Sequence, residues 1–277
     1  MSLDEIIENA LIEDLGDGDH TSLACIPVGS YRKAKLLVKE DGIIAGIEIA
    51  RKVFEKLDPT VVFNQLLKDG DVIKPGDIVF TVEGNPVSLL SSERLALNFL
   101  QRMSGIATKT NKMVKMLEGL NTKLLDTRKT TPNLRFIEKL AVKIGGGENH
   151  RFGLYDMIMI KDNHIDFSGG VSQAISNVKA YLKLKNKDLK IEIEVRNFNE
   201  LKEVLSIGSI QRIMLDNFSV PDLKLAVEMI AGRFETEASG GITETSLRKY
   251  AECGVDYISV GSLTHHIRSL DLSLKAY

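Results

Sequence analysis

Residues 190–217 read KIEIEVRNFNELKEVLSIGSIQRIMLDN, and this stretch holds the pattern that decides the fold. Two short apolar runs, residues 190–195 and 212–215, flank a segment with the character of a helix. Similar runs occur in the sequence on either side, at residues 123–126, 157–160, 234–238 and 256–260. This alternation of strands and helices predicts a parallel sheet or a (β/α) barrel.

Polar or glycine-rich clusters follow nearly every one of these runs. The clusters read DTRKT, KDNH, EVRN, LDNF, SGGI and SVGS. In a (β/α) barrel the active site forms at the carboxyl ends of the strands. Because unusual chemistry recurs at that one topological place, the sequence favours an enzyme of the barrel type.

The first part of the chain has a different texture. We expect helices at residues 3–13, 47–57 and 89–118, and strands at residues 34–40, 60–66 and 78–83. The segment IKPGDIVFTVEGN is similar to a lipoyl-carrier hairpin. Its Pro-Gly-Asp is ordinary turn chemistry, however, and no lone lysine stands at a hairpin tip.

Composition limits the classes of partner. The 277 residues carry a formal net charge of -2, which excludes a strong nonspecific attraction to nucleic acid or an anionic membrane. Cys25 and Cys253 form no CxxC pair, so a reducing compartment fits. The acidic start does not resemble a signal peptide. The apolar run at residues 42–50 contains Glu48 and is too short to span a membrane. We therefore expect a cytoplasmic protein with no nucleic-acid or membrane partner.

Three basic clusters suit an anionic substrate. Arg128 and Lys129 lie in DTRKTT, and an arginine can bind a carboxylate or phosphate through two hydrogen bonds. His150 and Arg151 follow three glycines that would let the backbone approach a ligand. Lys161 follows MIMI and could be an anion ligand or a Schiff-base lysine. The alternatives are a solvated surface pair, a flexible loop and an ordinary strand exit.

Carboxylates and glycine turns complete the pattern. Glu192 and Glu194 alternate with apolar residues, so both project to one face of their strand, and Asp216 ends the next strand. Such acids can hold Mg²⁺ or hydroxyl groups; an exposed strand face is the alternative. The turns at residues 239–241 and 259–262 each follow a strand, and we expect each to open a helix and receive a phosphate. The ligands indicated are a polyanion, a sugar phosphate and Mg²⁺.

Long stretches of the chain resemble the quinolinate phosphoribosyltransferase family, also called nicotinate-nucleotide pyrophosphorylase (carboxylating). They are RMSGIAT, LLDTRKTTPNLR, AVKIGGGENHRFGLYDMIMIKDNH, IEIEV, IMLDNF, EASGGIT and GVDYISVGSLTH, in that order, with EDLGDGDHTS and AKLLVKEDGIIAG before them. The resemblance covers essentially the whole chain. His20 and His266 depart from the family pattern, at the edges of motifs.

The resemblance implies an α/β fold of the type II phosphoribosyltransferases. Residues 1–105 would form an N-terminal α/β sandwich. Residues 106–277 would form an incomplete (β/α) barrel, with the last helix packing back on the N-terminal domain. The family also implies a homodimer or larger homo-oligomer, in which each active site is shared between two subunits.

The resemblance further assigns the site. Quinolinate would be bound by a basic cluster, with Arg102 coming from the neighbouring subunit. Glu194 and Asp216 would hold the ribose hydroxyls and Mg²⁺, directly or through water, and no organic cofactor is needed. Lys129, Lys161, Glu194 and Asp216 would be catalytic. The full set of substrate-binding residues implied is Arg102, Thr127, Arg128, Lys129, His150, Arg151, Lys161, Glu194, Asp216, Ser239, Gly240, Gly241, Val260, Gly261 and Ser262.

The implied reaction joins quinolinate to phosphoribosyl pyrophosphate and yields nicotinate mononucleotide, CO₂ and pyrophosphate, a step of NAD biosynthesis. Three rivals stay open. One is a paralogous transferase-like protein of molybdenum transport, although the KDNH segment at residues 161–164 argues against it. The others are a non-catalytic protein that kept the fold and a Schiff-base aldolase that uses Lys161.

Overall fold

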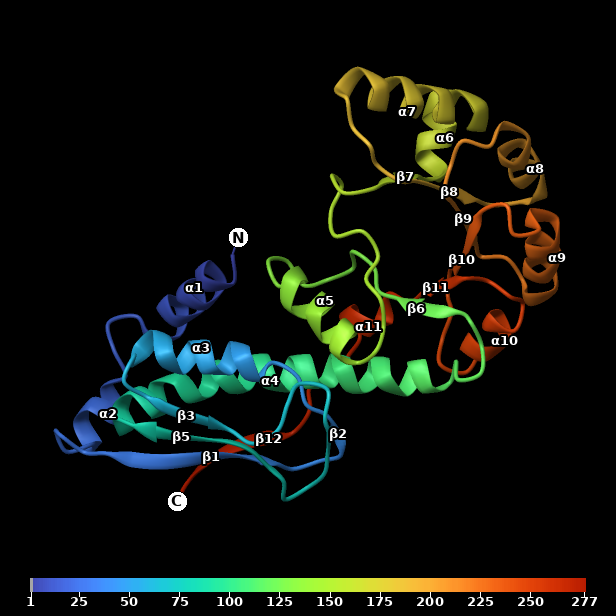
Figure 1. The fold of residues 1–277 in the computed structure, drawn as a ribbon. Coiled ribbons are helices and arrows are strands. Elements are labelled where there is room, and N and C mark those ends of the chain that lie inside the picture. Colours follow the sequence, from blue (N-terminus) through green and yellow to red (C-terminus); the bar gives the residue numbers. More distant parts are fainter. Residues whose placement is uncertain (1) are drawn as a thin grey trace. The chain divides into compact units, whose positions relative to one another are not determined.

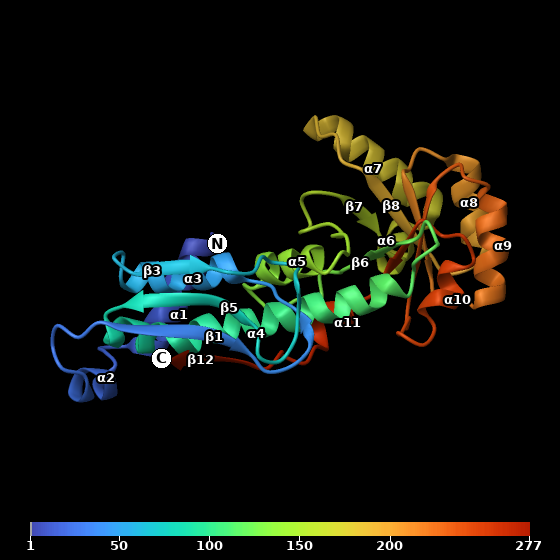
Figure 2. The ribbon, with the colours of Figure 1, turned by 60° about the horizontal axis from the view of Figure 1, so that its bottom comes forward.

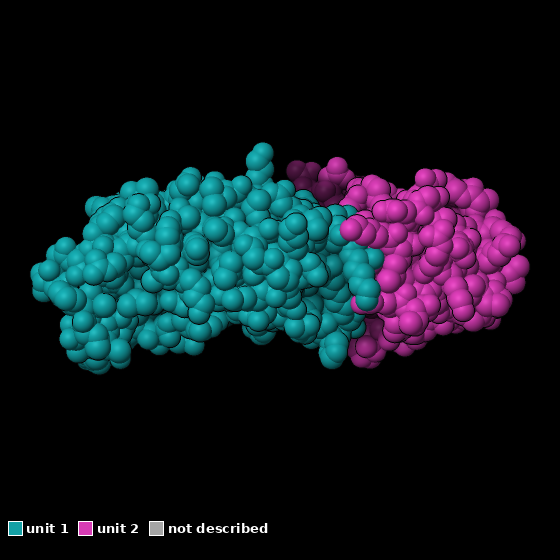
Figure 3. All heavy atoms as spheres, turned by 90° about the horizontal axis from the view of Figure 1, so that it is seen from below, with its two compact units in different colours: residues 1–112, 129–146, 262–277 teal, residues 113–128, 147–261 magenta. Residues whose placement is uncertain are grey.

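The computed structural model describes residues 2–277, and the chain divides into two compact units (Figures 1 and 3). The first unit contains residues 1–112, 129–146 and 262–277, and the second contains residues 113–128 and 147–261. Helix α4 (Pro86–Lys115) passes from the first unit into the second. The expected division between residues 105 and 106 falls within this helix and stays a prediction.

A four-stranded antiparallel sheet forms the centre of the first unit. Its order is β12 (Leu272–Ala276), β1 (Arg32–Val38), β5 (Ile78–Gly84) and β3 (Val62–Gln65). Strand β1 buries Ala34, Leu36 and Val38, so alternate residues face the core as a half-buried strand requires. Strand β12 was not expected from the sequence.

Six helices of the described chain lie wholly or mostly in the first unit. The helices of the first unit are α1 (Leu3–Leu15), α2 (His20–Cys25), α3 (Ile47–Leu57), most of α4, α5 (Arg135–Ile144) and α11 (Ser262–His265). Helix α3 lies beside β3 and β5 (Figure 1). The ring centroid of its Phe54 lies 6.2 Å from those of both Phe63 and Phe80. This aromatic group forms the centre of the core on that face.

The segment at residues 73–85 is not a hairpin. Strand β4 (Val72–Ile73) pairs with β2 (Gly42–Ile43), whereas β5 pairs with β1 and β3. Gly76 takes the left-handed conformation, with φ of 95°, in the turn that separates β4 from β5. The Pro-Gly-Asp sequence is therefore ordinary turn chemistry.

The second unit is built on a six-stranded parallel sheet. Its order is β6 (Lys123–Leu125), β11 (Tyr257–Ser259), β10 (Glu235–Ser239), β9 (Arg212–Asp216), β8 (Ile191–Val195) and β7 (Ile158–Ile160). No strand pairing joins β6 to β7 within residues 2–277, so the barrel does not close. The prediction of a mixed α/β fold with a parallel sheet is confirmed.

Five helices of the second unit connect these strands, and α8 to α10 lie along the outside of the sheet (Figures 1 and 2). They are α6 (Asp162–Ser168), α7 (Val171–Lys185), α8 (Phe198–Ile207), α9 (Val220–Ile230) and α10 (Leu247–Ala251). The side chains of Asn197 and Ser219 cap α8 and α9, which fixes where each helix begins after its strand. No helix of the described chain is both long and apolar enough to cross a bilayer.

Candidate active site

An ion pair joins the carboxyl ends of β7 and β8. Lys161 directly follows β7, and Glu194 lies near the end of β8. The Lys161 Nζ atom is 2.6 Å from Glu194 Oε2, and the Glu194 side chain is only 8% exposed. Both residues were predicted from the sequence, but as ligands of two different substrates. Their direct contact was not predicted.

A second polar pair lies at the ends of β9 and β10. Asp216 and Ser239 are register partners, and Ser239 Oγ donates a hydrogen bond of 2.6 Å to Asp216 Oδ1. The amide of Asn217 donates to the other carboxylate oxygen at 2.6 Å. Each oxygen of the Asp216 carboxylate therefore accepts a hydrogen bond from a neighbouring side chain, which fixes the orientation of the carboxylate.

Two glycines follow Ser239 in the left-handed region. Gly240 has φ of 92° and Gly241 has φ of 61°. A Cβ atom on Gly240 would lie 2.5 Å from Asn217 Cγ and 2.8 Å from its backbone nitrogen, whereas one on Gly241 would meet nothing within 4 Å. Only glycine fits at residue 240, because the turn packs directly against Asn217.

The glycine turns differ from the expectation at one point. Helix α10 begins only at Leu247, so the turn at residues 239–241 does not open a helix. Helix α11 does begin at Ser262, directly after the second turn, but it has four residues. Neither turn therefore opens a helix long enough to contribute a substantial dipole.

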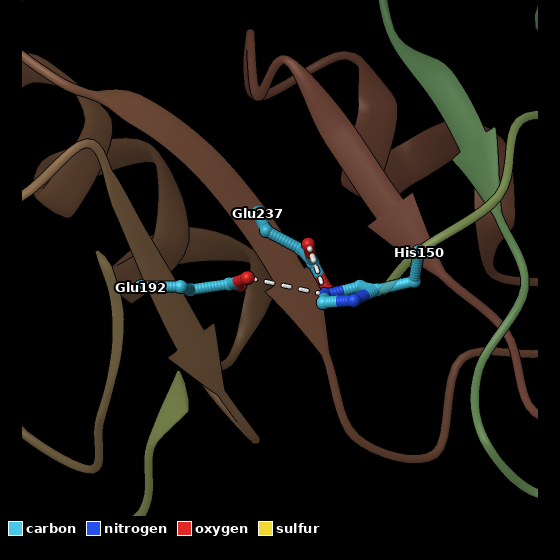
Figure 4. Close-up of side chains that lie close together, drawn as sticks. All are labelled: His150, Glu192 and Glu237. Atoms are coloured by element: carbon cyan, nitrogen blue, oxygen red, sulfur yellow. Dashed lines mark ion pairs between the residues drawn. The ribbon is translucent and has the colours of Figure 1, made fainter. Parts of the chain in front are cut away.

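Three buried side chains converge inside the parallel sheet. His150 points toward Glu192 of β8 and Glu237 of β10 (Figure 4). Its Nε2 atom lies 3.1 Å from Glu192 Oε2 and 3.3 Å from Glu237 Oε2. His150 Nδ1 accepts a hydrogen bond of 2.7 Å from the backbone N–H of Arg151, which leaves the ring proton on Nε2, facing the carboxylates.

These contacts shift the pKa values of the group. Burial lowers the pKa of His150, but the two carboxylates outweigh it and raise the value to about 9. The hydrogen bond from the Arg151 N–H to Nδ1 belongs to the neutral ring, so protonation of His150 has to break it; the two carboxylates near Nε2 favour the charged form. Burial and the charge of Glu237 raise the pKa of Glu192 to about 7. Burial alone would raise the pKa of Glu237, but the hydrogen bond and the charge of His150 lower it below its usual range.

Arg212 extends this buried group along β9. Its Nη1 atom lies 3.0 Å from Glu237 Oε2, its Nη2 atom lies 3.0 Å from Glu235 Oε2, and its guanidinium carbon lies 3.9 Å from the centre of the Tyr257 ring. Arg212 and His150 thus supply positive charge to the two buried glutamates. Without such partners, buried carboxylates would be strongly unfavourable.

Buried groups of the second unit also hold the loop that carries His150 and Arg151. Asp126, which is fully buried after β6, accepts hydrogen bonds from the His150 backbone N–H at 2.8 Å and from the Asn149 amide at 2.6 Å. Arg151 donates to the Met157 carbonyl at 3.1 Å. Burial and the nearby charge of Arg128 lower the pKa of Arg151. These two guanidinium groups therefore repel each other.

Gly145, the first of the three consecutive glycines, packs against helix α4. A Cβ atom there would lie 2.5 Å from the Ala107 carbonyl oxygen and 2.7 Å from Thr110 Cβ. Gly145 therefore allows α5 to end close to α4. This role in helix packing was not among the interpretations drawn from the sequence.

In the first unit, Arg102 of α4 binds Glu138 of α5. Arg102 Nε and Nη2 donate to Glu138 Oε1 at 2.8 and 2.5 Å, and the Glu138 side chain is fully buried. Lys129 also belongs to this unit, and its carbonyl accepts a hydrogen bond from the Thr264 hydroxyl at 2.8 Å. The remaining residues expected in the site belong to the second unit, except Ser262, and His150 and Arg151 among them lie in the loop between α5 and β7.

The donor sets bear on metal binding. His150, Glu192 and Glu237 could hold a metal ion, since one ligand atom from each lies within 4.8 Å of the others. Mg²⁺ prefers oxygen ligands and usually keeps several waters. Glu194 and Asp216 offer oxygen donors alone, and each already contacts a protein group, Lys161 and Ser239 respectively.

Sequence reasoning had singled out Glu192 only for its strand face, and it missed Glu237, Arg212 and Glu138. The alternation in IEIEV did place Glu192 inside the sheet. Glu237 lies in a similar alternating strand, ETEAS, and the same argument could have found it. Nothing local distinguishes Glu138, because its partner Arg102 lies 36 positions earlier.

Two models of one protein family match the chain over most of its length. The model described as quinolinate phosphoribosyl transferase, C-terminal domain, matches residues 106–275. The model of the N-terminal domain of the same family matches residues 19–104.

Individual relatives match over nearly the full chain. An Arabidopsis thaliana protein named nicotinate-nucleotide pyrophosphorylase (carboxylating), chloroplastic, is 47% identical, covering 99% of this chain and 82% of that protein. A Bacillus subtilis protein named probable nicotinate-nucleotide pyrophosphorylase (carboxylating) is 40% identical, covering 99% and 93%. The solved structure of NadC from Streptococcus pyogenes is 42% identical, with a TM-score of 0.94, covering 99% of this chain and 95% of that one.

Proposed function

Because this chain belongs to the quinolinate phosphoribosyltransferase family, we propose that it transfers the phosphoribosyl group of phosphoribosyl pyrophosphate to quinolinate. The products are nicotinate mononucleotide, CO₂ and pyrophosphate, as a step of NAD biosynthesis. One structural observation supports this most strongly. Cations and carboxylates adjoin at the carboxyl ends of the parallel strands, where Lys161 contacts Glu194.

Quinolinate carries two adjacent carboxylates, and the basic loops suit them. Arg128 and Arg151 are close enough for the charge of one to lower the pKa of the other. A dicarboxylate between them would relieve that repulsion and form charge-assisted hydrogen bonds. We assign quinolinate binding to Thr127, Arg128, Lys129, His150, Arg151 and Lys161, with Arg102 of a second subunit. His150 would act chiefly through Arg151, because both of its ring nitrogens already face protein groups.

The sugar phosphate suits the acids and the glycine turns. Glu194 and Asp216 would bind the ribose hydroxyls and hold Mg²⁺, which would offset the charge of the leaving pyrophosphate. The turn at residues 239–241 and Val260, Gly261 and Ser262 would receive a phosphate. The close contact with Asn217 at residue 240 fixes the backbone of the first turn, whose N–H groups would bind the phosphate.

The chemistry follows from these positions. The ring nitrogen of quinolinate attacks C1 of the ribose as pyrophosphate leaves, and Glu194 and Asp216 stabilise the cationic ribosyl centre. The carboxylate next to the nitrogen is then lost as CO₂. The bonding pair stays on the ring carbon, where the adjacent positive nitrogen stabilises it, and a proton from water adds there to give the product. Lys129 and Lys161 would bind the charged groups while these bonds change, and no organic cofactor is needed.

Assembly and location follow from the same premise. We propose a homodimer or larger homo-oligomer in which Arg102 completes the site of the neighbouring subunit. A cytoplasmic location fits the two cysteines, which form no disulfide within residues 2–277. The Schiff-base alternative has less support, because Lys161 is already paired with Glu194.

Substrate discrimination tests the proposal. Nicotinate lacks the carboxylate beside the ring nitrogen, so it should react with a far lower kcat/KM than quinolinate in the presence of phosphoribosyl pyrophosphate and Mg²⁺. Comparable kcat/KM values for the two acids would refute the assignment of paired cations to paired carboxylates. Borohydride trapping of a substrate adduct on Lys161 would instead favour the aldolase reading.

A further inference from the structure

Arg102 has one edge of its guanidinium group fully occupied by its own chain. Nε and Nη2 both donate to Glu138 Oε1, and Nη2 also approaches Thr131 Oγ1 at 2.8 Å and the Thr264 carbonyl at 3.4 Å. Within residues 2–277, Nη1 makes no hydrogen bond. The guanidinium group is therefore held by one edge while the opposite corner stays available.

Glu138 is the centre of this arrangement. Its side chain is fully buried, and its second oxygen, Oε2, accepts a hydrogen bond of 3.2 Å from the backbone N–H of Thr131. One carboxylate thus links α4, through Arg102, to the loop that precedes α5. These hydrogen bonds to a buried carboxylate fix the rotamer of Arg102. A free arginine side chain would instead lose much conformational entropy when a ligand orders it.

The partial exposure of Arg102 leaves room for a role beyond the ion pair. Its side chain is 30% exposed, although Glu138 is entirely covered. The ion pair with Glu138 needs only the Nε and Nη2 edge, so the Nη1 corner can make a further contact without breaking the pair.

We propose that Glu138 is a positioning residue that presents Arg102 Nη1 to a carboxylate of the substrate. This inference rests on the proposed function, in which Arg102 binds quinolinate. Glu138 itself touches no substrate. It holds the guanidinium group in one orientation, so that binding does not have to order it.

The chemistry of the pair defines the key variant. In Glu138→Gln the single amide oxygen can accept a hydrogen bond from Arg102 or from the Thr131 N–H, but not from both in the present geometry. The NH₂ group then faces whichever of these two donors the oxygen does not bind. Arg102 keeps its charge and loses its fixed orientation. Glu83→Gln is the matched control, because it removes the carboxylate partner of Lys33 elsewhere in the first unit.

The experiment measures quinolinate affinity by calorimetry without the second substrate, and KM for each substrate in turnover. Glu138→Gln should weaken quinolinate affinity about tenfold, in the range expected for loss of a charge-assisted contact, with the KM for phosphoribosyl pyrophosphate unchanged. Combined with Arg102→Ala it should add little further loss, because both variants remove the same contact. Glu83→Gln should leave both quantities unchanged.

Two outcomes separate the possible failures. If Arg102→Ala weakens quinolinate binding and Glu138→Gln does not, the positioning role is wrong and the proposed function stands. If Arg102→Ala itself leaves quinolinate affinity unchanged, Arg102 is not a substrate ligand and the positioning role fails with it. Should Glu138→Gln fail to fold, Thr131→Val removes the Nη2 acceptor and should produce a smaller loss in the same direction; unchanged quinolinate affinity in that variant would overturn the proposal.

Discussion

Lys161 and Glu194 form an ion pair across the ends of two neighbouring strands, with Nζ 2.6 Å from Oε2. We assign Lys161 to the pyridine dicarboxylate and Glu194 to the ribose. Their contact therefore lies at the junction of the two proposed substrate sites. A substrate that binds one residue of this pair would weaken its contact with the other residue, which the second substrate binds. The binding of the two substrates would therefore be coupled.

Replacement of Glu194 by Gln tests the acid's role. The change keeps the shape and removes the charge that would stabilise a cationic ribosyl centre. By analogy with loss of one preorganised electrostatic partner, it should cost about 2.7–4 kcal/mol, a loss of roughly a hundred- to a thousandfold in kcat. Steady-state kinetics measure kcat, and calorimetry measures quinolinate affinity, which should change much less. Abolished quinolinate binding with intact turnover would reverse the assigned roles.

The two glycines after Ser239 provide an internally matched pair. Gly240→Ala should destabilise the turn and raise the KM for phosphoribosyl pyrophosphate at least tenfold, because the new methyl group would overlap Asn217. Gly241→Ala also introduces a side chain at positive φ, but into open space, so its effect should be smaller. Thermal unfolding and KM measurements compare them, and equal effects would mean that the contact with Asn217 does not matter.

The buried histidine predicts how stability depends on pH. The pKa of His150 rises from 6.5 to about 9 on folding, so its contribution is complete below pH 6.5 and is lost as the pH rises through about 9. The pKa of Glu192 rises to about 7 on folding, so its contribution to stability is also lost as the pH rises, but over a lower range. The pKa of Glu237 falls on folding, so its contribution is lost as the pH falls, in the acid range. Between pH 7 and 9 the difference therefore comes from His150.

Denaturant unfolding of the wild type and of His150→Gln measures this contribution. The free energy of unfolding of the wild type should fall more steeply from pH 7 to pH 9 than that of the variant. His164→Gln, a change at a histidine outside the buried group, should keep the steep wild-type slope. Parallel slopes for the wild type and His150→Gln would show that His150 is not a cation in the folded protein.

Subunit mixing tests the shared site. Arg102→Ala and Lys161→Ala subunits should each be inactive alone, and mixed dimers should regain part of the activity because one of their two sites is intact. Loss of Arg102 leaves Glu138 buried without its cation, at a cost of about 3–5 kcal/mol, so folding of that variant must be checked by circular dichroism. Absence of activity after verified subunit exchange would contradict a site shared between subunits.

Local sequence patterns predicted most of the parallel sheet. The run IEIEV became β8, with both glutamates inside, and RIML became β9, because alternation and apolar character are properties of a few consecutive residues. Strand β12 was missed for the opposite reason. Its partner β1 lies more than 200 positions earlier, and nothing within residues 272–276 indicates that pairing.

The same limit applies to the candidate site. Lys161 and Glu194 were predicted from their places at strand ends, but their contact depends on the register of β7 with β8. Glu235 and Glu237 alternate identically in sequence, yet the Glu235 side chain is 38% exposed and that of Glu237 is fully buried. The two glutamates differ in how deeply they lie within the sheet, and tertiary packing sets that depth.

Release of the carboxylate next to the ring nitrogen tests the central claim most directly. The purified protein would be supplied with quinolinate labelled at that carboxylate, phosphoribosyl pyrophosphate and Mg²⁺, and labelled CO₂ and nicotinate mononucleotide would be counted together. We predict equal amounts of the two products, with neither formed when phosphoribosyl pyrophosphate is omitted. Nucleotide formed without CO₂, or CO₂ released without phosphoribosyl pyrophosphate, would contradict the account.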